Sequence, residues 1–281
     1  GPFVGDNCLA LAAMVSLPTL FEKLQVRPKS NLVFMAAARS LGRGNLEGLR
    51  YFLANSALPI HAGLCLEGVQ LGRLNYSCLG MFRGEIECRL PEDYKWAQFG
   101  STGAIIPMND VISRINKIPL PRRPLTSIVM GSIEGGITYH NIARQVTLRF
   151  EVRCEESELL KQIRQQIENI TADVAAQSGV KVKLDIFAER EPGGIDIAHS
   201  LVQNARAIIS ALGIEPTLYP TTSALSAFID RKIPAITLGI ATGERKSDLD
   251  EIDESVAIAP IFSGMAQLAA VVLSADEGEG K

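Results

Sequence analysis

Residues 145–190 read QVTLRFEVRCEESELLKQIRQQIENITADVAAQSGVKVKLDIFAER, and this stretch decides the fold of the middle of the chain. Apolar and polar residues alternate in 145–153 and again in 180–190, as in strands that bury one face. Between them, apolar residues recur at helical spacing from Ser157 to about Gln177, after an acidic start that suits the N-terminal end of a helix. The stretch therefore predicts a strand, an amphipathic helix and a second strand.

The sequence just before this stretch supplies the other half of a small domain. Residues 76–90 (YSCLGMFRGEIECRL) alternate like a half-exposed antiparallel strand, and a helix is expected over about 101–117, followed by a strand near 126–132. The resulting order, β-α-β-β-α-β, is typical of a ferredoxin-like domain with one open sheet face. Residues 77–190 are therefore predicted to form an α+β domain of this kind.

On both sides of this domain, helices alternate with short apolar strands. Helices are expected at 7–24, with a kink or break at Pro18, and at 44–55, 199–212, 224–230 and 255–274. Buried strands are expected at 31–36 (NLVFMA), 61–67 and 235–240 (AITLGI), with a further strand near Thr217. Such alternation is typical of an α/β layered domain. Residues 1–76 and 191–281 are thus predicted to form one α/β domain that the 77–190 domain interrupts, with a hinge at the two junctions.

Composition excludes several classes of function. The 281 residues carry a net charge of −3, so no basic field points to nucleic acid or to an anionic membrane. The most apolar stretch, 256–274, contains Pro260, Ser263, Gly264 and Gln267, which favours a buried helix over a membrane span. Five scattered cysteines, none in CxxC spacing, suit a reducing compartment, and the N-terminus has no basic signal-peptide region. A cytoplasmic protein is expected.

Five segments resemble one protein family in order along nearly the whole chain. They are GPFVGDN (1–7), GRGNLEG (42–48), CLEG followed by LGR (65–73), the span from Gly135-Gly136 through His140 to EVR (151–153), and IPAITLG (233–239). The family is the dinuclear-zinc amidohydrolase group that includes aminoacylases, glutamate carboxypeptidase and succinyl-diaminopimelate desuccinylase. The resemblance implies a three-layer zinc-peptidase-like α/β domain with an inserted α+β ferredoxin-like lid and dimerisation domain.

The resemblance also assigns residues to the site. Asp6 falls where the family has its metal-bridging aspartate, and Glu67 lies at the strand end that supplies a further carboxylate ligand. In the lid, Arg153 matches an arginine that grips a substrate carboxylate in two hydrogen bonds, and His140 stands where the family has an asparagine. Asp6 and Glu67 are thus the metal candidates, and His140 and Arg153 the substrate-binding candidates.

Most other positions depart from the family pattern. The paired glutamates that act as general base and metal ligand fall on Ser40 and Leu41, the last ligand histidine on Ser247, and the lid histidine on Tyr94. Ala224 replaces a further polar position, and the family's first histidine ligand would lie before residue 1. No catalytic residue is therefore assigned, and no cofactor is expected, although the family would use two zinc ions.

Physical chemistry leads to the same expectation. Two zinc ions need roughly seven ligand atoms and a base beside the bridging water, and this chain has three histidines, His61, His140 and His199, in no HxD, HxH or HExxH spacing. Asp6 and Glu67 alone make at most a weak site for a hard cation. Neither Cys8 nor the hydroxyl cluster at 221–223 has the surroundings of a nucleophile, and no glycine motif for nucleotides is present.

The leading hypothesis is a protein of hydrolase-like fold that does not hydrolyse, and that binds a peptide or amino-acid-like ligand in its cleft or serves as an assembly subunit. The alternative is an active zinc-dependent peptidase or N-acyl-amino-acid amidohydrolase whose site upstream residues or a partner chain complete. A third interpretation is a purely structural dimer without a ligand. A homodimer through the inserted domain is expected, with Trp96 and Phe99 either at the interface or in the lid core.

Overall fold

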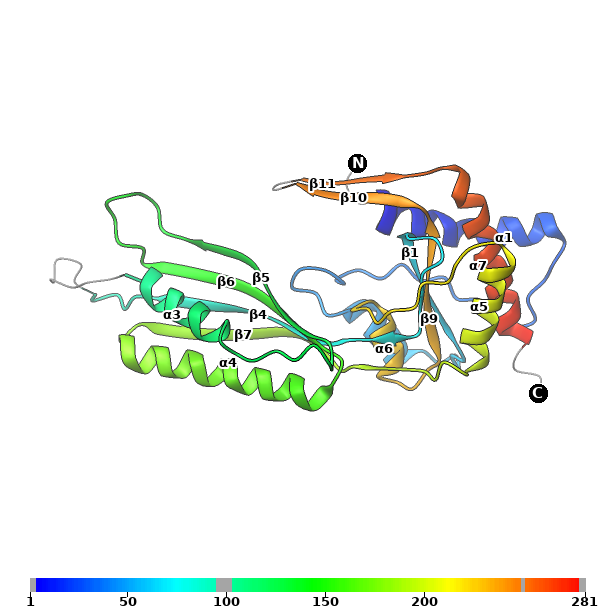
Figure 1. Cartoon of the computed structure of the whole chain (residues 1–281). Helices are drawn as coiled ribbons and strands as arrows, with labels where there is room; N and C mark the ends of the chain where they lie inside the picture. The colour runs from blue at the N-terminus through cyan, green and yellow to red at the C-terminus, as the bar shows by residue number, and fades with distance from the viewer. Residues whose placement is uncertain (1–3, 95–102, 249–250, 278–281) are drawn as a thin grey trace. The chain divides into compact units, whose positions relative to one another are not determined.

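The computed structural model describes residues 4–94, 103–248 and 251–277, and contacts divide the chain into two units. Unit 1 comprises Gly1–Ser40, Leu46–Cys78 and Gly193–Lys281, and unit 2 comprises Leu41–Asn45 and Leu79–Pro192 (Figure 1). The two junctions lie within two residues of those expected at 77 and 190. Residues 41–45, expected in the first domain, group instead with unit 2.

Unit 2 has the predicted order of elements. These are β4 (Gly80–Arg89), α3 (Ile105–Ile115), β5 (Thr126–Gly135), β6 (Gln145–Cys154), α4 (Ser157–Ser178) and β7 (Lys181–Arg190). The strands lie in the order β5-β6-β4-β7, and all neighbours are antiparallel. This is the arrangement of a ferredoxin-like domain.

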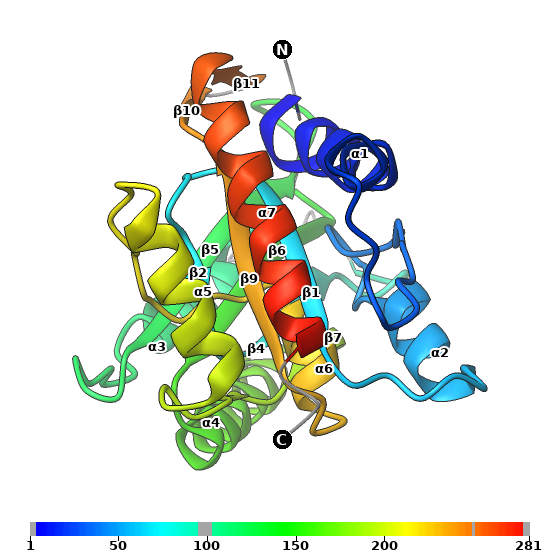
Figure 2. The same cartoon turned by 90° about the vertical axis from the view of Figure 1, so that its right-hand side faces the viewer.

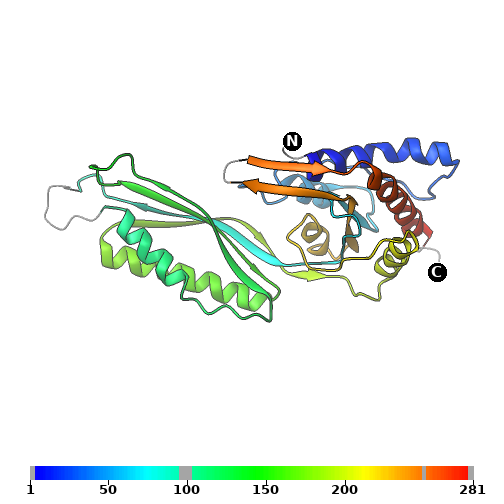
Figure 3. The ribbon, with the colours of Figure 1, turned by 45° about the horizontal axis from the view of Figure 1, so that its top comes forward.

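The two faces of this sheet differ because side chains alternate along each strand. Apolar residues of β4 and β6 point towards α3 and α4 and form one buried core, in which the rings of Phe82 and Phe150 meet edge to face with centroids 6.1 Å apart. Figure 3 shows both helices against the same face of the sheet. The other face carries charged residues, among them Arg83, Glu85 and Arg149, which explains the alternation seen in the sequence.

Unit 1 contains five α-helices within its described residues. They are α1 (Ala10–Leu24), preceded by a π-helical segment (Val4–Leu9), α2 (Glu47–Asn55), α5 (Ser200–Ala211), α6 (Leu225–Ile229) and α7 (Ala259–Glu277). Its main sheet has the order β1-β9-β2, formed by β1 (Gly63–Val69), β9 (Ala235–Ala241) and β2 (Leu74–Asn75). β1 and β9 are parallel, whereas β2 is antiparallel to β9.

Two short ribbons complete unit 1. β3 (Ser77–Cys78) pairs with β8 (Gly193–Gly194), and β10 (Gly243–Asp248) pairs with β11 (Glu251–Val256). The last helix therefore begins at Ala259 and not at 255 as expected, because residues 251–256 are held in a hairpin. Thr217 forms only an isolated bridge to Arg73 and no strand of its own.

The core of unit 1 is built around β9, which is buried at every residue. Figure 2 shows α7 across this strand, with α5 and α1 on its two sides. By length and composition alone α7 is apolar enough to cross a membrane, but Leu268, Val271 and Val272 are buried in the core, and Gln267 donates a hydrogen bond to the Gly239 carbonyl at 3.1 Å. One face of α7 therefore packs on the core of unit 1.

Two predictions about the N-terminal part of unit 1 have different outcomes. α1 has no break at Pro18, because the stripe of Ala13, Leu17 and Phe21 packs against the core on both sides of the proline, and a kink there stays a prediction. The segment 31–36 is not a buried strand: it has no regular structure, and Val33 is 51% exposed. An apolar run becomes a strand only where another strand pairs with its backbone, and the structure gives this segment no such neighbour in the part of the chain it describes.

Candidate functional site

Glu67 occupies the carboxyl half of β1, where it lies opposite Gly239 in the parallel pair with β9. Its side chain is 24% exposed and forms an ion pair with Arg73, whose side chain is only 11% exposed. The carboxylate expected to bind metal is therefore already neutralised by a guanidinium of the same unit.

Arg73 is itself fixed by several contacts. Its Nε donates to the side-chain oxygen of Gln70 at 3.0 Å, and its guanidinium carbon lies 5.6 Å from the centre of the Tyr219 ring. The Tyr219 hydroxyl donates to the same Gln70 oxygen. A cation held by a carboxylate, an amide and an aromatic face has little freedom to move away. Arg73 is thus held beside the carboxylate of Glu67 as its counter-ion.

The segment carrying Asp6 does meet the segment carrying Glu67. A Cβ on Gly68 would lie 1.3 Å from the Gly5 carbonyl oxygen, so the two backbones are in direct contact and glycine is required. The Gly5 amide also donates to the carboxylate of Glu254 at 2.8 Å. The structure describes the backbone of Asp6 within the π-helical segment but not its side chain. The segments that carry the two metal candidates are therefore in contact, but the positions of both carboxylates relative to one another are not given by this contact.

Glu254 is a carboxylate that sequence reasoning missed. It is 2% exposed, and its carboxylate accepts the Gly5 amide next to Asp6. In the sequence it is one of several acidic residues between 248 and 254, and nothing in that run marks it as the buried one. Only the β10–β11 hairpin, which was not predicted, places it against the N-terminal segment.

The two histidines of unit 1 lie outside the segments that carry Asp6 and Glu67. His61 precedes β1 and is exposed, while the Nδ1 atom of His199 accepts the Leu201 amide at 3.2 Å and so caps the start of α5. His140 belongs to unit 2. The side chains that the structure describes contain no group of three or more histidine, cysteine, aspartate or glutamate residues able to hold a metal ion.

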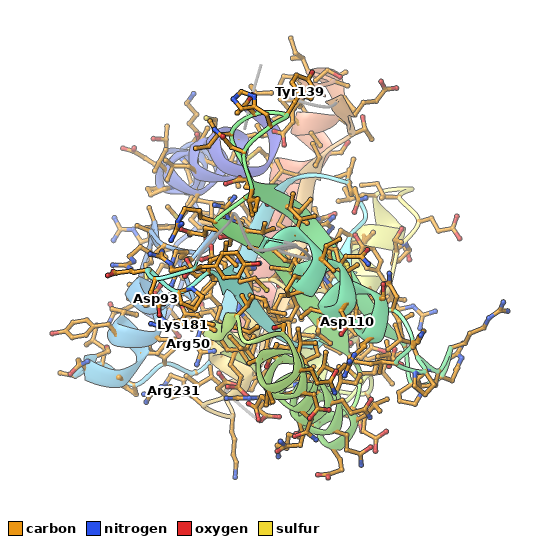
Figure 4. All side chains as sticks on the ribbon, turned by 90° about the vertical axis from the view of Figure 1, so that its left-hand side faces the viewer. Arg50, Asp93, Asp110, Tyr139, Lys181 and Arg231 are labelled. Atoms are coloured by element: carbon orange, nitrogen blue, oxygen red, sulfur yellow. The ribbon has the colours of Figure 1, made fainter. Side chains whose placement is uncertain are left out.

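The two substrate-binding candidates in unit 2 lie far apart. Arg153 pairs with Ser127 near one end of the β5–β6 ladder, whereas His140 lies in the connection beyond Gly135 and Val146 at the other end. Seven residues of strand separate Val146 from Arg153, which is about 23 Å. Tyr139, next to His140, is fully exposed (Figure 4). The structure does not bring His140 and Arg153 into one site.

Arg153 is engaged with Glu151 instead. Its Nε donates to one carboxylate oxygen of Glu151 at 2.5 Å, while Arg83 donates to the other at 2.7 Å. Burial by itself would raise the pKa of Glu151, but the hydrogen bonds from Arg153 and Arg83 outweigh it and hold the pKa below its usual value. The pair of arginines thus keeps a buried carboxylate ionised.

This arrangement predicts a pH-dependent stability. Because the folded pKa of Glu151 is lowered, its ion pairs stabilise unit 2 above the unfolded pKa of about 4.3, and this is lost as the pH falls through the folded pKa. We expect Glu151→Gln to lower the free energy of unfolding by about 2 kcal/mol near neutral pH. Urea denaturation should show this difference shrinking on acidification. A difference independent of pH would contradict the assignment.

The positions that depart from the family pattern are spread over both units. Ser40 and Leu41 lie in an exposed turn, and Tyr94 packs against the core of unit 2. Ala224 directly precedes α6, and the structure describes only the backbone of Ser247, in β10. Trp96 and Phe99, the expected interface residues, lie outside the described residues, so the homodimer stays a prediction.

The surroundings of Cys65 and Ser223 do not activate either side chain as a nucleophile. Burial raises the pKa of the Cys65 thiol to about 12, although a hydrogen bond with Thr237 counteracts this, so the thiol is protonated at neutral pH. The Ser223 hydroxyl lies 3.3 Å from that of Thr237 and accepts the Leu225 amide, as a residue at the start of a helix commonly does. Cys8 is exposed.

The chain shares its fold with solved structures of peptidases and amidases, which confirms the predicted α/β fold class. No family model and no curated protein sequence matches the chain. Solved structures with sequence identities of 12–17% do match it. At this level the likeness establishes the fold alone.

Three of these structures cover almost all of the chain. Aminopeptidase PepT from Bacillus cereus is 15% identical and has a TM-score of 0.71, with 95% of this chain aligned to 70% of that one. An amidase of the hydantoinase/carbamoylase family from Burkholderia vietnamiensis is 15% identical, with a TM-score of 0.74 and coverage of 98% and 77%. Human carnosine dipeptidase 1 is 12% identical, with a TM-score of 0.70 and coverage of 95% and 72%.

Proposed function

We propose that this chain has a metallopeptidase-like fold without hydrolytic activity, and that it works as a binding protein or as a subunit of an assembly. The observation that carries the proposal is the ion pair between Glu67 and Arg73. A zinc ion at Glu67 would have to displace a guanidinium that Gln70 and Tyr219 also hold. The positive charge of the guanidinium would weaken zinc binding at this carboxylate, because the two cations repel each other.

The residues aligned with the catalytic positions support the same proposal. The family's general base and its neighbouring ligand fall on Ser40 and Leu41, and Leu41 is 64% exposed. A serine hydroxyl does not accept a proton from a bridging water near neutral pH, and leucine offers no ligand atom. The polar positions needed for hydrolysis have thus changed, while the glycine contact between Gly5 and Gly68 is present.

The ligand class follows from the fold's solved relatives. Their names describe enzymes that act on short peptides or amides, such as a tripeptidase from Staphylococcus aureus and a carnosine dipeptidase. For this chain we therefore extend the proposal to short peptides or N-acyl amino acids, bound without cleavage. Arg153, paired with Glu151, is less available for a substrate carboxylate than the resemblance implied.

Metal content tests the proposal directly. The purified chain is loaded with zinc, exchanged into metal-free buffer and measured by elemental mass spectrometry, and hydrolysis of N-acetyl amino acids and dipeptides is assayed in parallel. We expect far less than one zinc ion per chain and no turnover. One or two retained zinc ions with zinc-dependent turnover would overturn the proposal.

A specific observation favours the active-enzyme alternative. The contact between Gly5 and Gly68 places the segments of Asp6 and Glu67 side by side, as a metal site at this point requires. If zinc is retained, Asp6→Asn and Glu67→Gln should each abolish it, since both replace an ionised ligand by a neutral amide. Exposed Glu215→Gln, in the same unit, serves as the matched control and should leave the zinc content unchanged.

A further inference from the structure

A second feature of unit 1 is a cavity of about 380 Å³ between α2 and the end of α6. Its lining residues are Arg50, Ala227, Asp230 and Arg231. The volume is within the range of cavities that hold small molecules. Figure 4 labels Arg50 and Arg231 close to each other beside α2.

The lining offers one guanidinium to a ligand. Arg50 forms an ion pair with Asp230 at 2.8 Å, and their side chains are 32% and 24% exposed. Arg231 has no hydrogen-bonded or ionic side-chain partner in the described part of the chain. The Arg231 guanidinium is therefore available to an anion, and its single positive charge favours a singly charged one.

The cavity is separate from the Glu67 site. α6 meets β1 at its beginning, where a Cβ on Gly63 would lie 2.6 Å from the Phe228 ring, and Arg231 follows Phe228 by three residues. Glu67 is four residues further along β1, about 13 Å away. A ligand in the cavity would thus not need the carboxylate that Arg73 occupies.

We infer that this cavity is a binding site for a small monocarboxylate. Arg231 offers a planar guanidinium that can donate two parallel hydrogen bonds to a carboxylate. Arg50 is paired with Asp230, and the Ala227 methyl group forms an apolar part of the wall. A doubly charged phosphate is disfavoured because Asp230 lies on the same wall and repels the additional negative charge.

Calorimetric titration of the full chain with N-acetylglycine at low ionic strength tests this inference. We expect a dissociation constant of roughly 1 mM. N-acetylglycinamide, which lacks the carboxylate, should show no binding. Arg231→Gln should weaken binding about tenfold or more, because it removes a charge-assisted pair of hydrogen bonds. Arg231 has no partner to lose, so the variant should keep the stability of the original chain.

Exposed Arg206→Gln on α5 is the matched control, since it removes the same charge from the same unit outside the cavity. It should leave the affinity unchanged. Absence of binding by the original chain, equal binding by the Arg231→Gln variant, or tighter binding of inorganic phosphate than of N-acetylglycine would each overturn the inference. None of these results bears on zinc content or hydrolysis, so the non-hydrolytic part of the proposed function fails or stands separately, and the Arg231→Gln variant distinguishes this cavity from any other binding site.

Discussion

Replacement of Gly264 by alanine is expected to lower the free energy of unfolding by about 3 kcal/mol. Gly264 lies on α7 where the helix crosses β9, and a Cβ there would sit 1.8 Å from the Ile240 carbonyl oxygen and 2.6 Å from its carbon. Since both atoms belong to the backbone of a fully buried strand, the helix must move to admit a methyl group. Urea denaturation of the two proteins measures the loss.

Helix propensity alone predicts that Gly264→Ala would raise the free energy of unfolding, so the two explanations give opposite results. Alanine favours a helix over glycine by about 1 kcal/mol, so an unhindered site would gain stability. The control is Ala266→Gly on the exposed side of α7, which should lose about 1 kcal/mol from propensity alone. If Gly264→Ala is as stable as the original chain or more so, the close approach of α7 to β9 is wrong.

The elements of unit 2 could be predicted from the sequence because the information is local. The strands β4, β6 and β7 each bury one face, and their apolar residues therefore alternate with charged ones. α4 has one apolar stripe, with Leu160, Ile163 and Ile167 buried at helical spacing. Each of these patterns arises because one face of the strand or helix packs against the core while the other faces away from it.

Unit 1 was harder to predict because burial on several sides removes the alternation. β9 is buried at every residue, and 31–36 has the same apolar character without being a strand. An apolar segment forms a strand only if a neighbouring strand pairs with its backbone, and the local sequence does not show whether such a neighbour exists. The β10–β11 hairpin was missed because its charged residues have no apolar alternation, although its paired residues are close in sequence, from Asp248 and Glu251 to Gly243 and Val256.

The grouping of residues 41–45 with unit 2 likewise rests on distant partners. Arg43 forms ion pairs with Glu85 at 2.8 Å and with Asp185 at 2.7 Å, and its guanidinium lies 4.1 Å from the centre of the Phe187 ring. Hydrogen bonding to Asp185 raises the pKa of Arg43, and the same contact lowers the pKa of Asp185. Nothing in the spacing of GRGNLEG indicates these partners.

At the candidate site, the sequence identified Glu67 but not its partner. The chain reverses between β1 and β2 in a turn where Gln70 and Gly72 have positive φ angles of 68° and 92°, and the Arg73 amide donates to the Gln70 carbonyl at 2.9 Å. Such a turn favours glycine and returns residue 73 towards residue 67. A glutamate and an arginine on either side of a glycine turn were therefore a usable signal for the ion pair.

Removal of Arg73 should show how strongly this pair stabilises unit 1. We expect Arg73→Met to lower the free energy of unfolding by about 3 kcal/mol, because it leaves the carboxylate of Glu67 mostly buried without its counter-ion. Glu67→Gln should cost less, since the Arg73 guanidinium keeps Gln70 and the Tyr219 ring as partners. The measurement is equilibrium denaturation of both variants and of the double variant.

The double variant separates the ion pair from the other contacts of Arg73. With both charges absent, no buried carboxylate is left unpaired, so the double variant should be more stable than Arg73→Met alone, with a coupling energy of about 1–3 kcal/mol. A coupling energy near zero would mean that Arg73 stabilises the turn through Gln70 and Tyr219 and not through Glu67. In that case Glu67 would be open to a metal ion, and the main support for a non-hydrolytic function would be lost.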